Sequence, residues 1–212
     1  MPGKFLNNYL LRYGGINDWH LQVFRVINTR FTPSKVLYPG SWIHLTPSLV
    51  FPFVTYVDLS SKILSAFSDS NLLQYIENHK EYQEKPKIKF HQTDYQSNLR
   101  EEKASFDLLI SLNSGLVSQA CGLYLKEGGV LFVNNEHYDA SRAYTDSKYK
   151  PIGVFKTVGK YIESEEIIHN YFITTKGDPI TLEMVNENLK RSPSKARHKL
   201  KKKSLFYTFQ RM

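Results

Sequence analysis

Apolar residues recur at helical spacing near the N-terminus and then gather into short runs divided by polar turns. Over residues 5–31 they recur every three or four positions, interrupted by Gly14 and Gly15, which predicts two helices. The later runs are rich in β-branched and aromatic residues and end at turn residues, which is typical of buried strands. The predicted strands are 35–38, 53–57, 87–91, 106–112 and 130–133.

Helical patterns separate these strands, over residues 60–67, 71–79 and 116–125. A hydroxyl cap is predicted to open the first helix, and Gly128 with Gly129 is predicted to end the last. Alternation of strands and helices requires right-handed crossovers and a mostly parallel sheet covered on both faces. We therefore predict an α/β fold with a Rossmann-like, doubly wound, mostly parallel seven-stranded sheet.

The C-terminal part departs from this alternation. Residues 162–174 contain an apolar stretch, 181–190 have helical spacing, and 205–210 are too apolar for a free tail. We predict that 205–210 is an antiparallel strand inserted between 162–174 and the fifth strand. The length of 212 residues fits one domain, so we expect an N-terminal helical extension, 1–34, and a domain spanning 35–212.

Charge is concentrated in one segment of the chain. The formal net charge is +8, and residues 190–203 carry eight positive charges and no acidic residue, so the rest of the chain is neutral. The eight are Lys190, Arg191, Lys195, Arg197, Lys199, Lys201, Lys202 and Lys203. This basic segment is either a solvated loop or a nucleic-acid-binding element, in which Phe206 and Tyr207 could stack on bases.

The remaining composition predicts a cytoplasmic protein that is not inserted in a membrane. The single cysteine, Cys121, has no neighbouring cation and is expected to be a small buried hydrophobe on a helix. Polar residues interrupt the N-terminus before any run long enough for a signal peptide. The longest apolar stretch, 49–54, is far shorter than the roughly 20 residues that a bilayer-spanning helix needs.

Two residues at strand ends indicate a nucleoside site. In open α/β sheets, ligands bind outside the carboxyl ends of the strands. Gly40 follows the first predicted strand and would let the backbone approach a ligand closely. Asp58 ends the next strand, where its carboxylate can accept hydrogen bonds from ribose hydroxyls.

Residues 36–41, 56–64, 106–111 and 124–133 resemble, in order and spacing, the motifs of the class I S-adenosylmethionine-dependent methyltransferases. The resemblance covers roughly residues 35–134. It implies S-adenosylmethionine as cofactor, an unknown methyl acceptor and no metal. It implies that Asp58 binds the ribose and that Asp94 lies near the adenine amine. The implied cofactor-binding residues are Tyr38, Gly40, Ser41, Asp58, Leu59, Asp94 and Asn113.

The chain departs from the family at the first glycine-rich motif. Tyr38, Trp42 and His44 stand where the family usually has an acid and several glycines. We therefore expect a cofactor pocket that is narrowed around the methionine end of the cofactor and binds it more weakly. No catalytic residue is assigned. Polar candidates near the strand ends, each better explained as a loop residue that bonds backbone groups, are His44, Asn113, Asn134, Asn135, Glu136 and His137.

Other functions are weighed against methyl transfer. Asn113 is not followed by the proline pair of adenine and glutamine methyltransferases, which argues against those acceptors. The turn at residues 40–45 lacks the G-x-G-x-x-G pattern, which argues against a nicotinamide dehydrogenase. A non-catalytic binding protein on the same scaffold stays open, because fold does not fix function.

Overall fold

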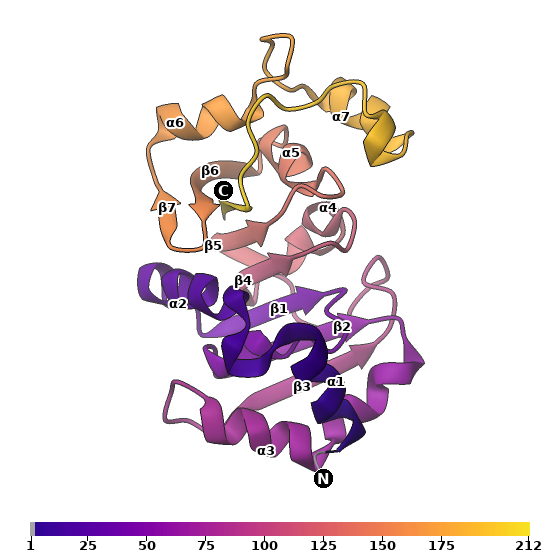
Figure 1. The fold of residues 1–212 in the computed structure, drawn as a ribbon. Helices are drawn as coiled ribbons and strands as arrows, with labels where there is room; N and C mark the ends of the chain where they lie inside the picture. Colours follow the sequence, from indigo (N-terminus) through magenta and orange to yellow (C-terminus); the bar gives the residue numbers. More distant parts are fainter. Residues whose placement is uncertain (1–2) are drawn as a thin grey trace. The chain divides into compact units, whose positions relative to one another are not determined.

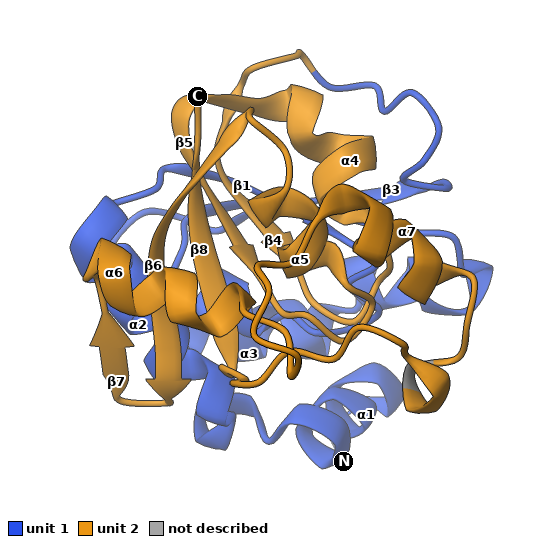
Figure 2. Ribbon diagram, turned by 90° about the horizontal axis from the view of Figure 1, so that it is seen from above, with its two compact units in different colours: residues 1–101 blue, residues 102–212 orange. Residues whose placement is uncertain are grey.

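The computed structural model describes residues 3–212. The chain divides into two compact units, unit 1 (residues 1–101) and unit 2 (residues 102–212), coloured separately in Figure 2. Both units combine β-strands with helices, which confirms the predicted α/β class. The boundary falls within 35–212, the range expected to form one domain, and that assignment stays a prediction.

Unit 1 contains three parallel strands in the order β3-β2-β1 (Figure 1). They are β1 (Lys35–Pro39), β2 (Phe53–Asp58) and β3 (Lys87–Gln92). Pro39 lies opposite Val57, and Asp58 lies opposite Gln92. The three carboxyl ends therefore share one edge, and the predicted strands of this unit are confirmed.

Helices of unit 1 begin and end at the residues that the sequence marks. Gly14, with φ +82°, ends the first helix, and the Asp18 carboxylate caps the second by accepting a hydrogen bond from the backbone N–H of His20. The α-helices are α1 (Lys4–Tyr13), α2 (Trp19–Phe31) and α3 (Ser70–His79). The 3₁₀ helices are η1 (Gly15–Asn17), η2 (Thr46–Leu49) and η3 (Ser61–Ser68).

The hydroxyl cap predicted for the helix over 60–67 is wrong. Ser60 precedes η3, but its side chain makes no capping hydrogen bond. The backbone N–H of Ser60 instead donates to Asp58 Oδ1 at 2.9 Å. The carboxylate at the end of β2 thus organises this turn in place of the serine hydroxyl.

Unit 2 contains five strands in the order β4-β5-β8-β6-β7. They are β4 (Phe106–Ser111), β5 (Leu125–Val133), β6 (Tyr149–Thr157), β7 (Lys160–Ile162) and β8 (Phe206–Arg211). Strands β4 and β5 are parallel, whereas β8 runs antiparallel to both β5 and β6. The insertion of an antiparallel C-terminal strand beside the fifth strand is confirmed.

The other neighbour of β8 differs from the prediction. Residues 162–174 do not form it, because Ser164 is followed by Glu165 and Glu166, which favour a helix N-terminus, and α6 begins there. The neighbour is β6, followed by the short strand β7. The described residues therefore form eight strands where seven were predicted.

The glycine pair of unit 2 does not end a helix as predicted. Helix α4 (Val117–Cys121) and the 3₁₀ helix η4 (Gly122–Tyr124) finish earlier, and Gly128 and Gly129 lie inside β5. Gly128 has φ +76°, and the pairing of β5 with β4 shifts register in this region. The two glycines thus lie in an irregular part of β5, where the positive φ of Gly128 disfavours other residues.

The remaining helices of unit 2 are α5 (Asp139–Tyr144), α6 (Glu165–His169), η5 (Asn170–Phe172), α7 (Leu182–Leu189) and η6 (Pro193–Lys195). Helix α5 packs against α4 and α7. Cys121 is fully buried at the end of α4, as expected. Within residues 3–212, no helix combines the length and the apolar character that crossing a bilayer requires.

Candidate functional site

The carboxyl edge of the unit 1 strands brings together three of the predicted residues. Gly40 follows β1, Asp58 is the last residue of β2, and Asp94 follows β3 by two residues. Because the strands are parallel, these positions lie at the same edge, where ligands of such sheets bind. The sequence therefore placed Gly40, Asp58 and Asp94 at a shared edge correctly.

Asp58 holds the loop after β1 in place. The backbone N–H of Trp42 donates to Asp58 Oδ2 at 2.9 Å, and that of Ser60 donates to Asp58 Oδ1 at 2.9 Å. Gly40 has φ +65° and donates its N–H to the carbonyl of Val57 at 2.7 Å. The side chain of Asp58 is half-buried, so the carboxylate is both fixed by the backbone and within reach of solvent.

Trp42 carries unfavourable backbone geometry in this loop. Its φ is +48°, a left-handed conformation that a bulky residue rarely adopts and that glycine adopts freely. The hydrogen bond from its N–H to Asp58 helps to hold this conformation. Trp42 thus stands where the backbone favours glycine, as the resemblance implied.

The other implied cofactor residues differ in accessibility. Tyr38 and Ser41 are buried, at 3% and 2% exposure, so a ligand could reach their backbone more readily than their side chains. Leu59 is 69% exposed, and Asp94 is exposed while its Oδ1 accepts from the N–H of Gln96. Asn113 belongs to unit 2, where it is exposed with φ +55°.

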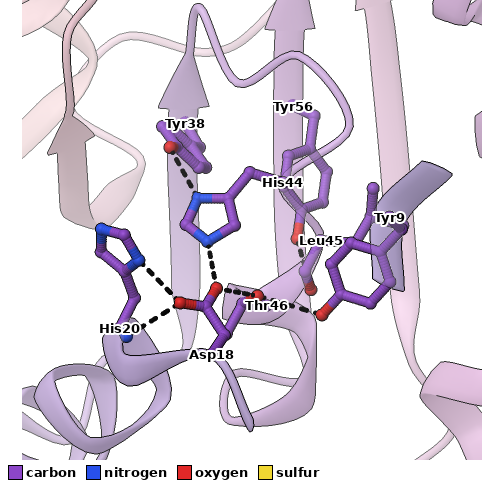
Figure 3. A network of polar contacts seen from close by, with 8 residues as sticks. All are labelled: Tyr9, Asp18, His20, Tyr38, His44, Leu45, Thr46 and Tyr56. Carbon is purple, nitrogen blue, oxygen red and sulfur yellow. Dashed lines mark hydrogen bonds and ion pairs between the residues drawn. The ribbon is translucent and has the colours of Figure 1, made fainter. Parts of the chain in front are cut away.

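A buried polar network in unit 1 escaped the sequence reasoning (Figure 3). Its centre is the Asp18 carboxylate, which caps α2. Asp18 Oδ2 lies 2.7 Å from His44 Nε2 and accepts a hydrogen bond from the Thr46 hydroxyl at 2.6 Å. Asp18 Oδ1 lies 2.7 Å from His20 Nδ1. The hydroxyl of Tyr38 lies 3.0 Å from His44 Nδ1, and that of Tyr9 lies 3.0 Å from the Thr46 hydroxyl oxygen.

The charges of this network follow from its burial and its hydrogen bonds. Burial tends to raise the pKa of Asp18, but hydrogen bonds from His20, His44 and Thr46 outweigh it, so the pKa is well below its usual value. Burial lowers the pKa of His44, against the opposing effect of Asp18. Asp18 is therefore an anion beside a neutral His44, whose Nε2–H donates to the carboxylate while Nδ1 accepts from Tyr38.

His44 consequently does not lie at the strand edge as a catalytic candidate. It is 3% exposed, its ring stacks on Tyr13 at 4.4 Å between centroids, and both ring nitrogens have partners. Its side chain points to the interior of unit 1 and not out of the carboxyl edge of the strands. The prediction that His44 narrows a cofactor pocket is therefore wrong, because Asp18 and Tyr38 hold the ring inward.

Asp18, His20 and His44 also form a donor set that a metal ion could use. One ligand atom from each lies within 4.8 Å of the others, and imidazole with carboxylate suits Zn²⁺. These atoms are already joined by hydrogen bonds of 2.7 Å, which a cation would have to displace. The cluster is therefore a hydrogen-bonded network.

The polar candidates of unit 2 mainly support its turns. Asn113 and Asn134 pair reciprocally: Asn134 Nδ2 donates to Asn113 Oδ1 at 2.6 Å, and the Asn113 backbone N–H donates to Asn134 Oδ1 at 3.3 Å. Asn135 Oδ1 accepts from the backbone N–H of Ser141 at 2.8 Å. Glu136 and His137 are exposed in the same turn between β5 and α5.

Asp139 is a buried carboxylate that the sequence reasoning also missed. It is 1% exposed and accepts hydrogen bonds from the hydroxyls of Ser111, at 2.6 Å, and Ser118, at 2.5 Å. Burial raises its pKa, although these hydrogen bonds oppose the shift. Asp139 thus joins the end of β4 to the starts of α4 and α5 and fixes the turn that contains Glu136.

Comparisons with known proteins give structural neighbours only. No family model and no curated protein matches the chain. A candidate S-adenosylmethionine-dependent methyltransferase from Methanococcus maripaludis is 20% identical, with a TM-score of 0.42 over 66% of this chain and 68% of that one. An S-adenosylmethionine-dependent methyltransferase from Mesorhizobium loti is 15% identical, with a TM-score of 0.40 over 92% and 99%. A methyltransferase from Geobacter sulfurreducens is 10% identical, with a TM-score of 0.46 over 73% and 85%.

Proposed function

We propose that the carboxyl edge of the unit 1 strands binds S-adenosylmethionine and that the protein is a methyltransferase whose acceptor is not identified. The observation that carries the proposal is the position of Asp58. It ends β2 beside the Gly40 turn, and two backbone amides fix its carboxylate. A preorganised acceptor at this edge suits the two hydroxyls of a ribose.

The residues at this edge fit a nucleoside. An ionised carboxylate offers about four acceptor positions, and the amides of Trp42 and Ser60 use two of them. The remaining two match the ribose hydroxyls. The adjacent side chain of Leu59 is 69% exposed and supplies an apolar surface for a flat base.

When bound, S-adenosylmethionine supplies a methyl group on an electrophilic sulfonium. The chain's own residues then have to orient the cofactor and exclude water, because methyl transfer depends mainly on alignment. Asp58 would orient the ribose of the cofactor. The loop at residues 40–42 would lie beside the methionine end of the cofactor, which is joined to the ribose. A general base is needed only if the acceptor loses a proton.

Calorimetric titration with S-adenosylmethionine tests the proposal. We expect the wild type to bind and Asp58→Ala to lose at least about a hundredfold in affinity, since two hydrogen bonds to a charged acceptor are removed. Asp69→Ala is the matched control, because it also removes a carboxylate that caps a backbone N–H in unit 1. The proposal is overturned if the wild type does not bind S-adenosylmethionine, or if a folded Asp58→Ala variant binds it as tightly as the wild type.

A second candidate is a non-catalytic binding protein on the same scaffold. The specific observation in its favour is Trp42, whose side chain stands at a backbone position suited to glycine. Such a protein would bind the cofactor weakly and transfer no methyl group to any acceptor. Calorimetry followed by a transfer assay with radiolabelled cofactor separates the two.

A further inference from the structure

A cavity of about 430 Å³ lies within unit 2, and none of its lining residues carries the proposed function. One wall is the turn between β5 and α5, with Asn135, Glu136 and Tyr138. The basic segment, residues 190–203, also lines the cavity and contributes Lys199 and Lys203. The volume falls within the range of small-molecule sites, about 300–1,000 Å³.

The basic segment is held in place by the body of unit 2. Asn188 on α7 is 1% exposed, and its Oδ1 accepts from the backbone N–H groups of Arg197, at 2.9 Å, and His198, at 3.0 Å. Its Nδ2 donates to the carbonyl of His198 at 2.8 Å. The N–H of Thr175 donates to the carbonyl of Lys199 at 2.8 Å. The wall of the cavity is therefore an ordered loop.

The charges of this loop are largely uncompensated. Arg197 pairs with Glu187, with 3.3 Å between Nη1 and Oε2. For the other seven cations of the segment, no ion-pair partner is found among residues 3–212. Lys199 and Lys203 are exposed at the cavity, and Glu136 is the one acid among its lining residues. Ordered, unpaired cations around a cavity favour an anion.

We infer that this cavity and the basic segment bind the phosphate backbone of a nucleic acid, with Lys199 and Lys203 as phosphate-binding side chains. A polymer fits better than a free nucleotide, because the cations extend beyond the cavity. A second hollow of about 360 Å³ is lined by Glu187, Lys190, Arg191 and Arg197. Binding through phosphates depends on salt and carries little sequence information.

The aromatic residues expected to stack on bases have little exposed ring surface, although Tyr207 lines the cavity. Phe206 is 3% exposed and Tyr207 is 1% exposed, since both belong to the packed strand β8. The expectation that they form a stacking surface is therefore wrong. Because the rings are buried, the affinity for nucleic acid has to come from charge. The site should therefore accept nucleic acids of different sequence.

Fluorescence anisotropy with a labelled single-stranded RNA of about 20 nucleotides tests the inference. For about five phosphate contacts, log K should fall with log salt at a slope near −3.5, or roughly a hundredfold in affinity between 50 and 200 mM KCl. Lys199→Glu/Lys203→Glu should bind at least about tenfold more weakly. Glu136→Gln should bind more tightly, because it removes the acid that faces the phosphate.

Lys150→Glu/Lys156→Glu is the matched control, since it changes the net charge equally at exposed positions of β6. It should lose less than about threefold, because long-range repulsion alone is screened. An equal loss in both double variants, or no RNA binding by the wild type, overturns the inference. Full displacement of the RNA by about 1 mM AMP would show a free-nucleotide site instead, and binding only to phosphatidylserine vesicles would show a membrane surface. The test does not depend on S-adenosylmethionine, so its outcome is independent of the proposed function.

Discussion

At the scale of single residues, Trp42 is the position where sequence and backbone disagree most. It adopts φ +48° between Gly40 and a buried segment, and its N–H is bound to Asp58. Non-glycine residues held in this conformation cost of order 1–3 kcal/mol and persist where the surroundings impose them. The carboxyl edge of the unit 1 strands therefore includes a residue that the backbone conformation alone would disfavour.

Replacing Trp42 separates the effect of its ring from that of its backbone. Trp42→Gly should raise the affinity for S-adenosylmethionine if the ring narrows the site. Trp42→Ala is the matched control, because it removes the ring but retains the positive φ, and it should be less stable than the glycine variant by about 1 kcal/mol. Calorimetry and thermal unfolding of both variants measure the two effects. A destabilised glycine variant with no gain in affinity would show that the half-buried ring is structural.

Asp18 is the residue on which the buried network depends. In Asp18→Asn the amide group brings hydrogens toward His20 and His44, which already donate. We expect a loss of about 3 kcal/mol in the free energy of unfolding, as for other broken buried charge networks. Asp69→Asn is the control, since asparagine caps a helix as well as aspartate does. Similar stabilities of the two variants in urea would contradict this account.

At the scale of elements, Asn188 determines whether the basic segment is ordered. Asn188→Ala removes three hydrogen bonds to Arg197 and His198. We expect faster amide exchange at those two residues and weaker RNA binding, with about 2 kcal/mol lost from stability. Asn186→Ala, at an exposed position of α7, is the control and should change neither. Unchanged exchange in Asn188→Ala would show that the loop is held by other contacts.

The elements that the sequence predicts well are those with a regular pattern. The strands of unit 1 have continuous apolar runs, and Asp58 could be placed because it directly follows one. Strand β6 was missed because Pro151 and Gly153 interrupt its pattern, and its register with β8 shifts between these two residues. The network escaped detection for another reason. Asp18 and His44 are 26 residues apart, and only packing brings them within 2.7 Å.

At the scale of the whole molecule, the two units carry buried acid–base groups whose effects on stability have opposite signs. In unit 1, burial lowers the pKa of His44. As pH falls, this histidine is therefore protonated in the unfolded chain at a higher pH than in the folded chain, which lowers stability. In unit 2, burial raises the pKa of Asp139, so its contribution is lost as pH rises from about 3.9 through the folded pKa. Mild acid should therefore lower the stability of unit 1 through His44, while protonation of Asp139 favours the folded state of unit 2.

Tryptophan fluorescence can detect the change in unit 1, because Trp19 and Trp42 are the two tryptophans of the chain and both lie in that unit. Between about pH 6.5, the usual pKa of histidine, and about pH 5.5, the free energy of unfolding in urea should fall by up to about 1 kcal/mol. His44→Gln should remove this fall, since glutamine does not titrate. His79→Gln, the same change at an exposed position of α3, should retain it. If His44→Gln keeps the pH dependence of the wild type, the neutral buried histidine cannot be its source, and the charge state assigned to the network is wrong.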